Sequence, residues 1–195
     1  MEPSVSRETL IERYFPSRRA EIERYAQFLV VEGALRGLIG PREGEKIWER
    51  HIFNSLPVST LIPFGATVID IGSGAGLPGI PLALSRPDIS MVLLEPLARR
   101  VEFLEEACAG LGITVLRGRA QDIKAQVQVV TARAVAPLEK LQLWSWHLLE
   151  KKGSLLAIKG LSAGEEAARV AGAHLHEIKM EGLELGRVIS LRKGA

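Results

Sequence analysis

Three glycines, at positions 72, 74 and 76, follow an apolar run that ends in Asp70. Such a segment predicts a buried strand that breaks into a tight turn and then opens a helix. Glycine lets the backbone lie close against a ligand, and the first N–H groups of a helix lack helical acceptors. The segment therefore predicts a site for a nucleotide-like molecule, and a tight turn without a ligand is the alternative interpretation.

The spacing of these glycines separates two classes of ligand. A dinucleotide fingerprint reads G-x-G-x-x-G, and its third glycine would fall on Leu77. The chain instead reads G-x-G-x-G, with an acid two positions before the first glycine. This pattern resembles the first motif of the class I S-adenosylmethionine (AdoMet) methyltransferases. A nicotinamide oxidoreductase is therefore the least favoured enzyme class.

A second acid, Glu95, closes the next apolar run, residues 90–94. In nucleotide-binding α/β folds an acid about 20 residues beyond the glycine turn accepts hydrogen bonds from ribose hydroxyls. Its position favours that role over a solvated helix start. Basic residues follow the later predicted strands at the edge where such folds bind ligands, which indicates either a basic site or a charge-balanced surface. These residues are Arg117, Arg119, Arg133 and Lys159.

The segment after the fourth predicted strand, Thr131–Val135, contains neither a general base nor a thiol. Methyltransferases that act on exocyclic amines of bases usually carry an Asn- or Asp-Pro-Pro-aromatic motif there, and those that act on pyrimidine carbons need a cysteine. The absence of both favours a nucleophile that needs no deprotonation, such as guanine N7. Catalysis would then consist of alignment and desolvation. Arg133 would bind a carboxylate, a phosphate, or guanine O6 and N7.

The order of the predicted elements indicates an α/β fold. Residues 1–60 read as a helical extension, which includes a helix from about Glu43 to Leu56. Strands and helices alternate from Thr67 onward, which predicts a seven-stranded, mostly parallel sheet in a Rossmann-like domain over residues 61–195. One helix places Cys108 on its buried stripe, where a structural thiol is expected. The predicted strands are 67–71, 90–94, 113–117, 127–132, 154–158, and a final hairpin near 174–181 and 186–192.

Composition limits the cellular location and the kinds of partner that we expect. The chain has 195 residues, and 25 Lys and Arg against 23 Asp and Glu give a formal net charge of +2. Charge alone therefore does not indicate a nucleic-acid partner. No apolar run approaches the ~18 residues of a membrane span, no secretory signal is evident, and the four histidines lack metal-ligand spacing. We expect a cytoplasmic protein with no membrane partner and no metal ion.

Six segments carry a more specific signal than the glycines. They are WERHIFNSL (48–56), DIGSGAGLPGIPLAL (70–84), RVEFLEEACAGLGI (100–113), GRAQD (118–122), VTARAVAPLEKL (130–141) and LLAIKG (155–160). In this order and spacing they resemble the bacterial glucose-inhibited division protein B family. The resemblance implies transfer of a methyl group from AdoMet to N7 of a guanine in the decoding-site loop of 16S rRNA. The expected partner is that RNA or the small ribosomal subunit, and we expect a monomer.

The resemblance implies that the turn at Gly72, Leu77, the Ala120–Gln121 segment and Arg133 bind AdoMet. We expect Arg133 also to orient the reactants, as the one catalytic residue. We name three RNA-binding candidates, Arg50, His51 and Lys159. The full set predicted to bind the cofactor is Asp70, Gly72, Gly74, Gly76, Leu77, Glu95, Ala120, Gln121 and Arg133.

The chain departs from the family pattern at two places. An Asn-Leu-Thr-type stretch is replaced by Arg36–Glu43, and the usual Asp of His-x-x-Asp-Ser is Asn54. Both changes leave the role of the N-terminal helices open. A class I methyltransferase with a small-molecule or protein substrate, and a non-catalytic AdoMet-binding module, remain alternative functions.

Overall fold

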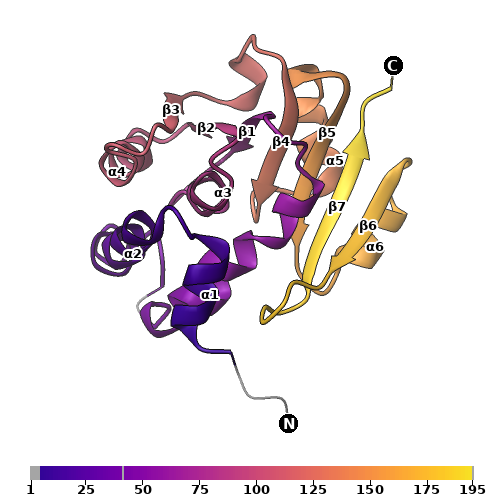
Figure 1. Cartoon of the computed structure of the whole chain (residues 1–195). Helices are drawn as coiled ribbons and strands as arrows, with labels where there is room; N and C mark the ends of the chain where they lie inside the picture. The colour runs from indigo at the N-terminus through magenta and orange to yellow at the C-terminus, as the bar shows by residue number, and fades with distance from the viewer. Residues whose placement is uncertain (1–4, 41, 195) are drawn as a thin grey trace.

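A computed structural model describes residues 5–40 and 42–194, so residues 1–4, 41 and 195 of the predicted domain ranges lie outside it. It contains a seven-stranded sheet of order β3-β2-β1-β4-β5-β7-β6 (Figure 1). All pairs are parallel except that β7 runs antiparallel to both β5 and β6. The predicted fold class is therefore confirmed. The strands are β1 (Thr67–Ile71), β2 (Ser90–Glu95), β3 (Thr114–Arg117), β4 (Val127–Arg133), β5 (Leu149–Lys159), β6 (Ala173–Ile178) and β7 (Gly186–Arg192).

Helices cover both faces of the sheet, as the alternating pattern predicts (Figure 1). One face carries α1, α2, α3 and α4, and the other carries α5 and α6, because the central strands send side chains to two separate apolar clusters, one on each face. The helices are α1 (Arg7–Tyr14), α2 (Arg19–Phe28), α3 (Gly79–Ser85), α4 (Ala98–Ala107), α5 (Leu138–Ser145) and α6 (Ala163–Ala168).

The N-terminal segment shares one hydrophobic core with the sheet. Phe15, Ile22 and Ile52 are fully buried in the same cluster as Val68 of β1 and Leu93 of β2. Cys108 is also buried in that cluster, as predicted, and burial raises the pKa of its thiol to about 12. The N-terminal helices are thus part of what holds the sheet in place.

The helix predicted from Glu43 to Leu56 is not a continuous α-helix. The chain forms a 3₁₀ turn, η2 (Gly44–Lys46), a π-helical turn, η3 (Ile47–Ile52), and two further 3₁₀ turns, η4 (Phe53–Ser55) and η5 (Pro57–Leu61). The apolar spacing indicates the buried side correctly, but side-chain donors occupy carbonyl groups that an α-helix would use. Ser55 Oγ donates to the carbonyl of His51 at 2.6 Å, and such bonds distort helices.

No described helix is long and apolar enough to cross a membrane. Within residues 5–40 and 42–194, no group of three or more His, Cys, Asp or Glu side chains is arranged to hold a metal ion.

Candidate active site

The glycine turn leads from β1 to α3. Gly72 has a φ of +65°, which L side chains rarely adopt, and a Cβ there would lie 2.9 Å from Val135 Cγ2. At Gly76 a Cβ would collide with Ile80 on α3. Tyr25 of α2 donates a hydrogen bond from its hydroxyl group to the carbonyl of Ala75 in this turn, at 2.9 Å. The turn is therefore fixed on one side by the N-terminal helices and on the other by the segment after β4.

Asp70 lies beneath this turn and has no exposed surface. Its Oδ1 accepts a hydrogen bond from Thr131 Oγ1 at 3.0 Å, and its backbone carbonyl accepts one from Ser73 Oγ. Burial raises the pKa of Asp70 to about 7. The sequence predicts a contact with the cofactor, but an unexposed carboxyl can only support the turn from behind.

Glu95 ends β2 and is also almost fully buried. Its two carboxylate oxygens accept the backbone N–H groups of Gly74 and Leu97, both at 3.0 Å. It therefore joins the glycine turn to the start of α4. Each oxygen has a second acceptor position, and the contact with a ribose stays a prediction.

Two cavities meet at Gly72. The larger, about 320 Å³, is lined by the glycine turn, by the N-terminal segment and by two arginines. The smaller, about 100 Å³, lies between the loop after β3 and the side chains of Val135 and Trp144. The larger cavity is lined by Leu38, Ile39, Gly40, His51, Gly72, Ser73, Gly74, Ala75, Leu77, Arg100, Arg133 and Ala134. The smaller is lined by Ile71, Gly72, Leu94, Pro96, Gly118, Arg119, Ala120, Gln121, Val135 and Trp144.

The structure thus brings most of the predicted cofactor residues together. Gly72, Gly74, Leu77 and Arg133 line the larger cavity, and Gly72 with the Ala120–Gln121 segment lines the smaller one. The residues Asp70, Gly76 and Glu95 line neither cavity but support the turn, and the ribose contact of Glu95 stays a prediction.

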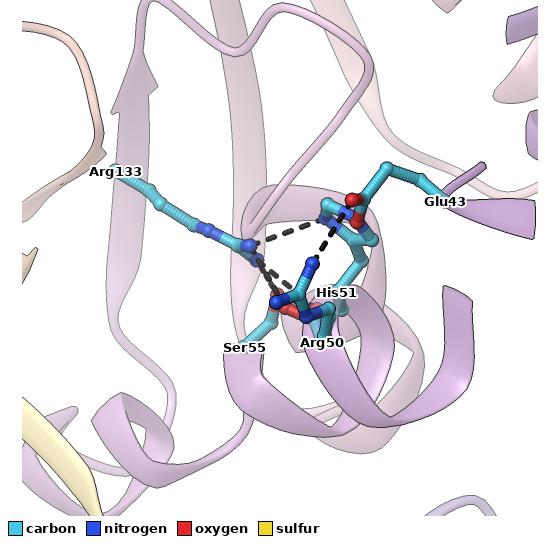
Figure 2. Close-up of polar contacts among 5 residues, drawn as sticks. All are labelled: Glu43, Arg50, His51, Ser55 and Arg133. Carbon is cyan, nitrogen blue, oxygen red and sulfur yellow. Dashed lines mark hydrogen bonds and ion pairs between the residues drawn. The ribbon is translucent and has the colours of Figure 1, made fainter. Parts of the chain in front are cut away.

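Arg133 ends β4 and reaches into the N-terminal segment (Figure 2). Its Nη1 donates to the carbonyl of His51 at 3.1 Å and to Ser55 Oγ at 3.3 Å. Its Nη2 donates to the carbonyl of Arg50 at 2.9 Å and contacts His51 Nδ1 at 3.2 Å. Both terminal nitrogens of Arg133 therefore bind residues 50–55. These are the two nitrogens that would bind a guanine or a carboxylate in a bidentate manner, and both already have partners within the protein.

The three predicted RNA-binding residues differ in exposure. The side chain of Arg50 is 58% exposed and pairs with Glu43 Oε1 at 3.0 Å. His51 is largely covered and lines the larger cavity. Lys159 is only 12% exposed, and its Nζ donates to the carbonyl of Ala136 and to Glu166 Oε1. An RNA contact by Lys159 does not fit this placement, because the amine is committed to the loop after β4.

Sequence reasoning gave no binding role to six residues that line the cavities. Arg100 of α4 lines the larger cavity, and its Nη1 lies 3.8 Å from Glu95. Leu38, Ile39 and Gly40 form its N-terminal wall, while Val135 and Trp144 border the smaller cavity. A signal existed only for Arg100, which follows the acid at the end of β2. The N-terminal wall depends on how the first helices pack on the sheet, which periodicity does not reveal.

Comparison with known proteins decides the family. A family model described as GidB, rRNA small subunit methyltransferase G, matches residues 18–189. The chain belongs to the GidB family. The match confirms the family that the six sequence segments indicate, and it includes residues 18–60 of the N-terminal segment.

Curated GidB relatives match most of the chain. The small-subunit rRNA methyltransferase G of Streptomyces avermitilis is 52% identical over 165 residues, which cover 82% of this chain and 69% of the relative. The corresponding protein of Streptomyces coelicolor is 50% identical, with coverage of 86% and 72%. That of Thermobifida fusca is 49% identical, with coverage of 88% and 73%.

Solved structures resemble this GidB protein in fold alone. A ribosomal protein L11 methylase from Lactobacillus delbrueckii aligns with a TM-score of 0.56 at 17% identity, over 72% of this chain and 77% of that one. A predicted O-methyltransferase from Agrobacterium tumefaciens aligns with a TM-score of 0.56 at 19% identity, over 73% and 81%. Both similarities agree with a class I methyltransferase fold.

Proposed function

We propose that this GidB protein transfers a methyl group from AdoMet to N7 of a guanine in 16S rRNA. The observation that carries the proposal is the pair of cavities that meet at Gly72. They lie beside the segment Thr131–Val135 at the end of β4, which contains neither a general base nor a thiol. The relatives named above, small-subunit rRNA methyltransferases, support the choice of an RNA substrate.

The residues present fit AdoMet as the methyl donor. The smaller cavity, between Ala120–Gln121 and Val135, offers apolar walls to a purine ring. The first N–H groups of the 3₁₀ turn at Ala120 are the kind of donor that a ring nitrogen accepts. The larger cavity offers backbone and cationic groups to an amino-acid moiety. AdoMet supplies the electrophilic methyl group.

The groups around the larger cavity favour a nucleophile with a free lone pair. His51 is its one histidine, and both ring nitrogens already have partners, Arg133 Nη2 and Glu43 Oε2. The other titratable side chains that line it, Arg100 and Arg133, are cations and cannot act as bases at neutral pH. Guanine N7 needs no base, whereas an exocyclic amine or a hydroxyl would need one.

We propose a monomeric enzyme that works without a metal ion, because transfer of a methyl group from AdoMet to the free lone pair of N7 needs alignment rather than a Lewis acid. A ribosomal RNA substrate implies action in the cytoplasm. Cation side chains near the site, such as the exposed Arg50, are the proposed contacts with RNA phosphates.

The test uses small ribosomal subunits and their naked 16S rRNA, both from cells that lack 7-methylguanine in this RNA. Each is incubated with the protein and AdoMet labelled on the methyl group, and strand cleavage at 7-methylguanine locates the product. We expect one modified guanine in the decoding-site loop. Label at an exocyclic amine or a carbon would overturn the assignment to N7. Tight AdoMet binding with no transfer to either RNA would favour a binding module.

A further inference from the structure

We propose that Glu43 and His51 are positioning residues that fix the guanidinium of Arg133 through a chain of hydrogen bonds. The chain runs from Glu43 Oε2 to His51 Nε2 at 2.8 Å, and from His51 Nδ1 to Arg133 Nη2 at 3.2 Å (Figure 2). The inference deepens the proposed function because Arg133 lines the larger cavity of the methyl-transfer site.

The chemistry of the three groups allows one arrangement of protons. A guanidinium only donates hydrogen bonds, so His51 Nδ1 must accept from Arg133 and cannot carry a proton. The ring proton then lies on Nε2, where the Glu43 carboxylate accepts it. The other tautomer would point an N–H group at the N–H group of Arg133 and would leave the Glu43 carboxylate without its ring donor. Arg133 and Glu43 therefore favour the same tautomer, and removal of the carboxylate weakens that preference.

The surroundings keep this chain in place. The charged groups that face His51 are Glu43, Arg50 and Arg133. Arg50 Nη1 binds the second carboxylate oxygen of Glu43, so that both oxygens have partners. The side chains of His51 and Glu43 are 18% and 27% exposed. Partial burial, the largest effect, and the nearby guanidinium lower the pKa of His51, which favours the neutral ring that the geometry requires.

The position of Glu43 in the chain gives the arrangement a consequence for the cavity. Glu43 follows closely after Leu38, Ile39 and Gly40, which form the N-terminal wall of the larger cavity. Arg133, at the end of β4, lines the same cavity. The chain Glu43–His51–Arg133 therefore links the N-terminal segment to the end of β4 at this cavity. It also gives a role to the segment Arg36–Glu43, whose departure from the family pattern leaves the N-terminal helices unexplained.

The first test reads the tautomer directly and does not depend on methyl transfer. In protein labelled with ¹⁵N-histidine, long-range ¹H–¹⁵N spectra distinguish Nε2–H from Nδ1–H rings, and the His51→Asn variant identifies the signals of His51. We expect an Nε2–H ring in the unaltered protein at pH 8, and a mixture of tautomers in Glu43→Ala. An Nδ1–H or charged ring at pH 8, or an unchanged tautomer in Glu43→Ala, would overturn the inference even if the enzyme is active.

The second test is a double-mutant cycle on methyl transfer. Glu43→Ala should lower kcat/KM about tenfold or more, whereas Glu43→Gln, which keeps an acceptor for Nε2–H, should retain most activity. In His51→Asn the amide oxygen can still accept from Arg133, and no Nε2 remains for Glu43 to bind. Glu43→Ala should therefore have no further effect in that background.

The matched control is Glu45→Ala, an exposed neighbour that should behave like the unaltered protein. Equal losses from Glu43→Ala in both backgrounds would overturn the positioning role, because they would show that Glu43 acts independently of His51. Failure of the unaltered protein to methylate RNA, with the Nε2–H tautomer intact, would overturn the proposed function and leave the positioning role supported.

Discussion

The absence of a side chain at Gly72 is expected to matter for AdoMet binding, and a single substitution tests this. Gly72→Ala would place a methyl group against Val135, where the two cavities meet, and would strain a left-handed backbone. Gly65 has nearly the same φ, +68°, but a Cβ there meets nothing within 4 Å. Both variants should lose about 1 kcal/mol of stability from backbone strain.

Only Gly72→Ala should also weaken AdoMet binding, by at least tenfold in calorimetric titration. Equal affinities in Gly72→Ala and Gly65→Ala would show that the cofactor does not pass over Gly72.

Asp70 makes the stability of the protein depend on pH. Its pKa is raised by burial to about 7, whereas an unfolded Asp has a pKa of about 3.9. Between these values the folded protein binds more protons than the unfolded chain, so the free energy of unfolding falls as the pH rises from about 4 to about 7. Asp70→Asn removes the ionisation.

In urea denaturation, the stability of Asp70→Asn relative to the unaltered protein should therefore increase with pH, by up to about 1.4 kcal/mol per pH unit within that range. The exposed Asp122→Asn is the control and should show a constant difference. A constant difference for Asp70→Asn as well would mean that the folded protein leaves this carboxyl as acidic as in water.

At the scale of elements, Lys159 links the end of β5 to the loop between β4 and α5. Its Nζ binds the carbonyl of Ala136 and Glu166 Oε1, and the same oxygen accepts the N–H of Leu138 at the start of α5. Lys159→Met leaves Glu166 partly buried without its cation, so we expect a loss of about 1–3 kcal/mol in the free energy of unfolding.

The exposed Lys140→Met of α5 is the matched control, with an expected change within about 0.5 kcal/mol. Both variants should bind RNA with the same dependence on salt. If the RNA affinity of Lys159→Met alone depended less on salt, Lys159 would contact RNA after all, as the sequence predicts.

The elements that periodicity predicts well are those that short apolar runs define. The strand 67–71 and the strand 186–192 agree with β1 and β7 at both ends, because their residues are buried by neighbouring strands. The helix over 43–56 could not be predicted correctly, because its carbonyl groups bind Arg133, which lies 82 residues after His51. The burial and pairing of Lys159 could not be predicted for the same reason, because its partner Glu166 lies on another element, α6.

At the scale of the whole molecule, the candidate site depends on both halves of the chain. The glycine turn and the Ala120–Gln121 segment could be predicted, because each follows a predicted strand, and the parallel strands β1 to β5 all end at one edge of the sheet. The roles of Asp70 and Glu95 as supports could not, because burial within the turn leaves no separate signal in the sequence. The wall at Leu38–Gly40 likewise becomes visible only once the N-terminal helices share their core with the sheet.

The strand order has a consequence for the time at which the protein becomes competent during its own synthesis. Because β7, Gly186–Arg192, lies between β5 and β6, the sheet cannot be completed until residues 186–192 have left the ribosome. The helices α1 and α2 emerge first, yet the strands that cover their apolar sides come much later. His51 likewise gains its partner Arg133 only after the chain has been synthesised as far as β4. A protein that we propose modifies ribosomal RNA therefore completes the sheet that carries its binding cavities only after residues 186–192 have been synthesised.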